Sequence, residues 1–240
     1  MNSPEIWCVV PAAGIGSRMQ AQTPKQYLPL AGKTVAQWTL ERLASIQQLS
    51  GIIVPLRDHD PYWQNVKLPG HIRVETVAGG KERSDSVLNG LNWLNSHVHQ
   101  DAWVLVHDMA RPCVRLADIN RLIEQGRQHP DGALLASPVV DTLKSQTGEA
   151  LPSVDANVDR QRLWHALTPQ FFPVRLLREA LINAVSRNAA ITDDASAIEL
   201  MGGSPLLVES ARDNIKITMP EDLLMAELIL TAQRKSPQFN

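Results

Sequence analysis

IWCVVPAAGIGSRMQAQTPKQ, residues 6–26, joins a short apolar run to a loop of small and cationic residues. The run IWCVV has no polar alternation, which is typical of a strand buried on both faces of a sheet. Small residues after such a strand let the backbone approach a ligand, and loop amides attract anions. Arg18 and Lys25 each add roughly 4 kcal/mol against a phosphate at about 4 Å and an effective dielectric near 20. The stretch predicts a polyphosphate site at the carboxyl end of a first strand.

The rest of the chain alternates between strand and helix patterns. Further β-prone runs lie at 52–56, 72–77, 102–107, 132–139 and 205–208. Helical patterns lie at 34–46, 84–96, 116–128, 173–188, 194–201 and from Pro220 onward. Such alternation gives a mostly parallel sheet with helices on both faces. We therefore expect an α/β fold and a single domain over residues 1–240.

The alternation breaks between about residues 140 and 165, where a polar segment is too long for an ordinary connection. This segment is either a disordered insert or a β-hairpin arm that packs against a partner. Its apolar residues favour the arm: Leu143, Leu151, Val154, Val158 and Leu163.

Composition narrows the class of protein. A formal net charge of −2 and a pI near 6.4 argue against binding nucleic acid through a general basic field, so any anion site must be local. Cys8 and Cys113 show no metal or disulfide spacing and are expected to be free structural thiols. The amino terminus does not resemble a signal peptide, and no apolar run approaches the roughly 20 residues that span a bilayer. We expect a cytoplasmic protein without a membrane partner.

Two familiar phosphate-binding loops fit the opening stretch poorly. The dinucleotide fingerprint needs GxGxxG, but Met19 stands where the third glycine should be, and no acid ends the second strand near 56–57. The nucleoside-triphosphate P-loop needs GxxxxGK[ST]; Gly32, Lys33 and Thr34 match its end, but Tyr27 replaces its first glycine. A plain glycine-rich turn would explain the glycines but not the run AAGIG followed by PKQ. A strand, a small-residue loop and two fixed cations remain.

The pattern P-A-A-G-x-G-x-R-M followed by P-K-Q resembles the 2-C-methyl-D-erythritol 4-phosphate cytidylyltransferases of the non-mevalonate isoprenoid pathway. Six further segments occur in that family's order and spacing, so the resemblance covers roughly residues 6 to 230. They are GGKERSDSV at 79–87, VLVHDMARP at 104–112, VDTLK at 140–144, VDRQRLWHALTPQFF at 158–172, ITDDASAIE at 191–199 and DNIKIT at 213–218.

The resemblance implies a Rossmann-like nucleotidyltransferase fold with a protruding arm that forms a homodimer. It also implies transfer of the cytidylyl group of CTP to 2-C-methyl-D-erythritol 4-phosphate, with release of pyrophosphate and with Mg²⁺ or another divalent cation. The implied catalytic residues are Arg18, Lys25 and Lys216. The implied CTP-binding residues are Pro11, Ala12, Ala13, Gly14, Gly16, Gly80, Ser86, Asp108 and Met109. The implied substrate-binding residues are Asp108, Arg111, Thr142, Arg160, Thr168, Thr192 and Lys216, with Asp108 also near the metal.

Several of these residues have a simpler explanation. Ser86 could cap the helix at 84–96, and Asp108 could cap a turn before Pro112. Arg160 on its own would be a solvated charge, so its substrate role, reached across a dimer interface, depends on the resemblance. His107 is expected to be a hydrogen-bonded scaffold residue.

The chain departs from the family at two positions. Met109 stands where alanine is usual, near the expected ribose site, and Lys81 stands where an acid is common. Neither departure removes a catalytic group, so both bear on nucleotide affinity rather than on the reaction.

Other functions fit less well. A ribitol 5-phosphate cytidylyltransferase would share the fold and the CTP loop, but WHALTPQFF and ITDDAS favour methylerythritol phosphate. A sugar-1-phosphate nucleotidyltransferase usually carries a longer loop and an extra domain. A CTP-binding regulatory module would not need Arg18, Lys25, Asp108 and Lys216 together, since a sensor needs no charge at the α-phosphorus. A fused cyclase would need about 150 more residues, by the usual size of a domain.

Overall fold

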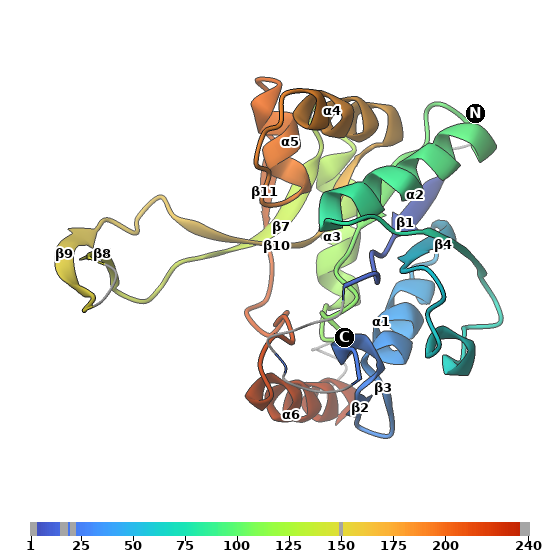
Figure 1. The fold of residues 1–240 in the computed structure, drawn as a ribbon, viewed down its shortest axis with the longest axis horizontal. Helices are drawn as coiled ribbons and strands as arrows, with labels where there is room; N and C mark the ends of the chain where they lie inside the picture. The colour runs from blue at the N-terminus through green and yellow to red at the C-terminus, as the bar shows by residue number, and fades with distance from the viewer. Residues whose placement is uncertain (1–3, 15–18, 20–22, 149–150, 236–240) are drawn as a thin grey trace.

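A seven-stranded sheet forms the centre of the protein in a computed structural model that describes residues 4–14, 19, 23–148 and 151–235 (Figure 1). In spatial order its strands are β11 (Leu206–Glu209), β7 (Ala133–Pro138), β10 (Trp164–Pro173), β6 (Trp103–Val106), β1 (Ile6–Val9), β4 (Leu49–Leu56) and β5 (Arg73–Ala78). All neighbouring pairs are parallel except those of β10, which runs antiparallel to both β6 and β7. The expected mostly parallel α/β sheet is confirmed.

The first strand shows why its sequence lacks polar alternation. Ile6 and Cys8 pack into the hydrophobic core on one face of the sheet, while Trp7 and Val9 pack into the core on the other face. Both faces are therefore buried, and each position along the strand needs an apolar side chain.

Helices cover both faces. One core contains residues of α1 (Val35–Ala44) and α3 (Leu116–Gly126). The other contains residues of α2 (Arg83–His97), α4 (Val174–Ser186) and α5 (Asp194–Leu200). A third, smaller core lies under α6 (Glu221–Lys235), where Ala226 and Leu230 pack with Ala110, Cys113 and Ile217. This third core joins α6 to the segments that follow β6 and β11.

Short elements complete the chain. A small hairpin, β2 (Pro29–Leu30) and β3 (Lys33–Thr34), lies beside α6 and follows the 3-10 turn η2 (Lys25–Tyr27). A second 3-10 turn, η3 (Trp63–Asn65), lies between β4 and β5. The hairpin was not among the sequence expectations, because two-residue strands have no periodicity.

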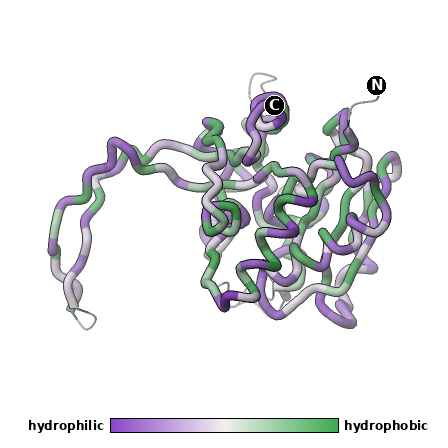
Figure 2. Tube along the Cα trace, turned by 90° about the horizontal axis from the view of Figure 1, so that it is seen from above, coloured by the Kyte–Doolittle hydropathy of each residue, from purple (hydrophilic) through white to green (hydrophobic). Residues whose placement is uncertain are grey.

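The segment after β7 forms the expected arm. β8 (Leu143–Thr147) and β9 (Ser153–Val158) pair with each other as a separate two-stranded sheet. The arm extends well away from the body in two perpendicular views (Figures 1 and 2). Leu151 and Val154 on it are 86% and 67% exposed, so the arm's apolar side chains are not covered by this chain.

One strand of the central sheet was missed by the sequence. Residues 164–173 form β10, in the middle of the sheet, although the polar residues of WHALTPQ gave no strand pattern and Pro169 cannot donate to a ladder. The pairing of β10 with β7 shifts register between Ala166 and Gln170, and this irregularity accommodates the proline.

In the part of the chain that the structure describes, no helix is long and apolar enough to cross a membrane.

Candidate active site

A cleft of about 300 Å³ opens at the carboxyl ends of β1, β5 and β6. It is lined by the loop after β1, by the loop and first turn of α2 after β5, by the loop after β6, and by Lys216. The residues are Pro11, Ala12, Ala13, Gly14, Lys25, Gln26, Gly80, Lys81, Glu82, Arg83, Ser86, Asp108, Met109, Ala110 and Lys216. Ligands of open α/β sheets bind at such strand ends.

Hydrogen bonds within this cleft hold its two glycine loops. Gln26 is buried, and its side-chain amide donates to the carbonyls of Ala12 (2.8 Å) and Gly14 (3.1 Å). Across the cleft, the Gly80 amide donates to the Ser86 hydroxyl at 3.0 Å. Ser86 lies inside α2 rather than at its cap, since the helix begins at Arg83 and the Glu82 amide is bound by Asp85. The Ser86 hydroxyl therefore sets the Gly80 loop.

The packing around Gly80 requires a glycine, whereas the described atoms around Gly14 do not. A Cβ at Gly80 would overlap Asp85, so glycine is demanded there by the fold itself. A Cβ at Gly14 would have no neighbour within 4 Å among the described atoms. The absence of a side chain at Gly14 leaves the loop's backbone open to a ligand.

A second cavity of about 250 Å³ adjoins the first. Its lining residues are Arg83, Asp108, Arg111, Ala166, Leu167, Thr168, Gln170, Thr192, Asp193 and Lys216. Arg83, Asp108 and Lys216 line both cavities. Two ligands bound in the two cavities would therefore meet at these three side chains.

An ionic cluster forms this junction. One oxygen of Asp108 accepts from Arg83 Nε at 2.9 Å, and the other accepts from Lys216 Nζ at 2.8 Å. Arg111 Nε lies 3.5 Å from the second oxygen. Arg83 also donates through Nη2 to Asp194 at 2.8 Å, so its guanidinium bridges two carboxylates. The three cations outnumber the two carboxylates, which leaves the junction suited to anions.

Burial and these contacts set the ionisation of the cluster. Burial alone would raise the pKa of Asp108, but the neighbouring cations, Arg83 foremost, hold that pKa far below its usual range. The pKa of Asp194 is raised by burial, and Arg83 opposes the shift. Burial disfavours the charge on Arg83 itself, yet Asp194 and Asp108 raise its pKa above the ordinary arginine value.

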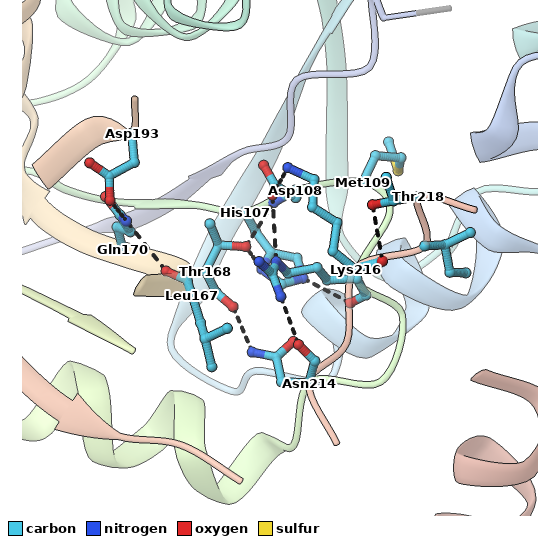
Figure 3. Close-up of polar contacts among 12 residues, drawn as sticks. His107, Asp108, Met109, Leu167, Thr168, Gln170, Asp193, Asn214, Lys216 and Thr218 are labelled. Atoms are coloured by element: carbon cyan, nitrogen blue, oxygen red, sulfur yellow. Dashed lines mark hydrogen bonds and ion pairs between the residues drawn. The ribbon is translucent and has the colours of Figure 1, made fainter. Parts of the chain in front are cut away.

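His107 is the buried support of the loop that follows β6 (Figure 3). Its Nε2 lies 3.0 Å from the Arg111 carbonyl, which can only accept, so Nε2 carries the proton. Nδ1 then accepts from the Thr168 hydroxyl at 3.0 Å, and the same hydroxyl accepts from the Asp108 amide at 3.1 Å. Burial lowers the pKa of His107 to about 4, so the ring is neutral at pH 7. This is the scaffold role expected from the sequence.

Of the predicted catalytic residues Lys25 and Arg18, the structure describes only Lys25. Lys25 lies in the first cleft, where its Nζ donates to the Ile217 carbonyl at 2.9 Å, next to Lys216. Arg18 and Gly16 lie outside the described residues. Met109 lines the first cleft, is 4% exposed and also belongs to the hydrophobic core.

The arm residues Thr142 and Arg160 are brought together in a third cavity of about 330 Å³. Its other lining residues are Asn157, Val158, Asp159 and Gln161, and none of the six lines the two cavities at the sheet. The structure therefore unites these two predicted substrate residues but separates them from Thr168, Thr192 and Arg111 of the same chain.

The sequence profile of 2-C-methyl-D-erythritol 4-phosphate cytidylyltransferase matches residues 6–232, nearly the whole fold just described. The chain belongs to this family.

Individual members are similar over almost their full length. The cytidylyltransferase of Vibrio parahaemolyticus is 50% identical over 226 residues, covering 94% of this chain and 95% of the relative. That of Vibrio cholerae is 50% identical over 227 residues, covering 95% and 97%. The crystal structure of the Francisella tularensis enzyme matches with a TM-score of 0.80 and 34% identity, over 94% of this chain and 99% of that one.

Three residues of this cytidylyltransferase site were missed by the sequence: Arg83, Asp194 and Asn214. The sequence held a weak signal for Arg83, which is the first residue of a helix. A cation at that position is disfavoured by the helix dipole, so its presence suggests a role other than stabilising the helix. Asp194 and Asn214 lie in recognised motifs, but their contacts join segments more than 40 residues apart and leave no local pattern.

Proposed function

We propose that this chain transfers the cytidylyl group of CTP to 2-C-methyl-D-erythritol 4-phosphate and releases pyrophosphate. The observation that carries the proposal is the junction of two cavities at Arg83, Asp108 and Lys216. A nucleotidyl transfer needs a triphosphate and a phosphate acceptor held in line, with cations where negative charge gathers. The junction offers that arrangement.

CTP is assigned to the first cleft. The small residues Ala12, Ala13 and Gly80 leave backbone amides and carbonyls free to read the edge of the cytosine ring, as Ser86 holds the Gly80 loop. Lys25 lies in the same cleft beside the triphosphate loop. We assign Arg18, in that loop, to the triphosphate as well, on the strength of the family's pattern.

The acceptor is assigned to the second cavity. Arg111 and Lys216 supply cations for its phosphate, and the hydroxyls of Thr168 and Thr192 can bind polyol or phosphate oxygens. A phosphate oxygen of the acceptor attacks the α-phosphorus of CTP, and the bond from that phosphorus to the bridging oxygen of pyrophosphate breaks. Lys216 lines both cavities and stabilises the charge that builds on the α-phosphoryl oxygens.

We assign a divalent cation to the junction at Asp108. This carboxylate lines both cavities, and its neighbouring cations keep it ionised, as a metal ligand must be. Its two oxygens already accept from Arg83 and Lys216, so most ligands of the metal would be substrate phosphates and water, as is common for Mg²⁺. When bound, the metal would neutralise part of the charge of the triphosphate.

The arm is proposed to complete the acceptor cavity of a second copy. Thr142 and Arg160 lie together on the arm, away from their own chain's acceptor cavity, and exposed apolar side chains such as Leu151 and Val154 suit an interface between copies. A homodimer would then have two sites, each built from both chains.

Complementation tests this arrangement. Arg160→Met and Lys216→Met are each expected to be inactive, but mixed dimers formed from the two would contain one intact site. Random mixing would restore about a quarter of the wild-type activity, since dimers of this kind are symmetric. Activity that stays at the level of the separate variants would show that the arm serves its own chain.

Pyrophosphate release tests the function itself. The purified protein with Mg²⁺ should release pyrophosphate rapidly with CTP and 2-C-methyl-D-erythritol 4-phosphate, and far more slowly with UTP or ATP, or with D-ribitol 5-phosphate as acceptor. Faster release with ribitol phosphate would overturn the acceptor assignment but keep the nucleotide cleft. No release with any pair would overturn the enzyme assignment in favour of a CTP-binding module.

A further inference from the structure

The segment that carries Lys216 has no regular secondary structure between β11 and α6. Its place is set by individual contacts instead. The Ile217 amide donates to the Ala110 carbonyl at 2.8 Å. The Asp213 carboxylate accepts from both Nε and Nη2 of Arg115, and the shortest of these contacts is 2.7 Å. Gln233 on α6 also donates to Asp213, at 3.2 Å. The outer end of the segment is therefore anchored to the body of the protein.

Asn214 links this anchored segment to the second cavity. Its side-chain amide nitrogen donates to the Thr168 carbonyl at 2.8 Å, and its own backbone carbonyl accepts from Arg111 Nη1 at 2.7 Å. Figure 3 shows Asn214 directed toward Thr168, with Lys216 on the same stretch of chain. Asn214 is 2% exposed, so neither contact competes with bulk water. One residue thus connects Thr168, Arg111 and the Lys216 segment.

The contact requires a hydrogen-bond donor at position 214, which the amide of Asn214 supplies. The Thr168 carbonyl can only accept a hydrogen bond, so its partner must donate. An aspartate of the same shape would place two acceptors 2.8 Å apart. A buried carbonyl without a donor is destabilised and moves toward another partner, and Thr168 would carry its cavity-lining hydroxyl with it.

We propose that Asn214 is a positioning residue for the acceptor half of the site: it sets Thr168 and Arg111 relative to Lys216 without touching the substrate. The inference rests on the assignment of the second cavity to the acceptor. It predicts a selective effect, because the contacts of Asn214 reach residues of the second cavity and not the glycine loops of the first.

Steady-state kinetics with Asn214→Asp test the proposal. The KM for 2-C-methyl-D-erythritol 4-phosphate should rise tenfold or more and kcat should fall, while the KM for CTP stays within twofold. Asn183→Asp is the matched control, since it makes the same change of charge on α4, outside both cavities. It should leave both KM values unchanged.

Asn214→Ser is the second variant, uncharged and too short to reach the Thr168 carbonyl, and it should show the same selective rise if the aspartate variant folds poorly. A lower kcat with both KM values unchanged would mean only a smaller folded fraction and would overturn the positioning role. Equal rises in the two KM values would overturn it as well. Turnover by the wild-type protein, measured alongside, establishes the acceptor assignment separately.

Discussion

Replacing Arg83 with methionine should remove about 4 kcal/mol from the free energy of unfolding at pH 7. Arg83 donates to Asp194 at 2.8 Å; the Asp194 side chain is 1% exposed, and its Oδ1 is buried without a hydrogen-bond partner among the described residues. Without the guanidinium, the buried carboxyl loses its charged partner. Breaking a buried ion pair by removing one partner costs about 3–5 kcal/mol, which gives the figure of about 4 kcal/mol.

The deficit should depend on pH with a definite sign. Burial raises the pKa of Asp194 in the intact protein and Arg83 opposes that rise, so loss of Arg83 should raise this pKa further. A raised folded-state pKa gives stability that is present at low pH and is lost as the pH rises, so the deficit against wild type should shrink as the pH falls from 7 to 5. Asp108 retains two other cations, Lys216 at 2.8 Å and Arg111 at 3.5 Å, and both favour its ionised form.

Urea unfolding followed by tryptophan fluorescence at pH 5, 6 and 7 measures both quantities, since the chain has six tryptophans. Arg175→Met is the control: Arg175 donates to Glu179 at 2.9 Å, but its side chain is 73% exposed. The control should be indistinguishable from wild type. An Arg83→Met deficit no larger than the control, or one that does not change with pH, would refute an ionised buried pair at the junction.

Three further predictions follow from single contacts. Lys216→Met should lower kcat about 100-fold or more, as loss of one preorganised donor does, and normal turnover would exclude its role at the α-phosphate. Gly14→Ala should raise the KM for CTP without lowering the melting temperature. Gly80→Ala should raise that KM and also lower the melting temperature, because its Cβ would overlap Asp85. Equal losses of melting temperature in the two variants would contradict this difference. Because burial lowers the pKa of His107 to about 4, the unfolded state binds its proton first as the pH falls from 6.5. Wild type should therefore lose about 3 kcal/mol of stability between pH 6.5 and 4 from this group, and a smaller acid slope in His107→Gln would confirm it.

The local signals of the sequence predicted most of the sheet. The continuous apolar run 6–10 indicated a strand buried on both faces, and Ile6 and Trp7 indeed pack into opposite cores. Loops after such strands converge at one edge of a parallel sheet, which is why the loops at 11–14 and 79–86 form one cleft. β10 escaped prediction because its polar residues serve the second cavity and its proline needs an irregular register.

The junction itself could be predicted only in part. Asp108 and Lys216 came from the resemblance, whereas Arg83 and Asn214 act through contacts to residues 25 to 111 positions away. Periodicity and spacing carry no information on such long-range partners. The roles of Thr142 and Arg160 cannot be read from one chain, since the structure groups them on an arm that leaves its own site.

A crystal structure with CTP and Mg²⁺ tests the two-cavity account most directly. The account predicts cytosine against Ala12, Ala13 and Gly80, with the α-phosphate at the junction beside Lys216 and the second cavity left open for the acceptor. A nucleotide bound in the second cavity, or a triphosphate directed away from Asp108 and Lys216, would contradict it.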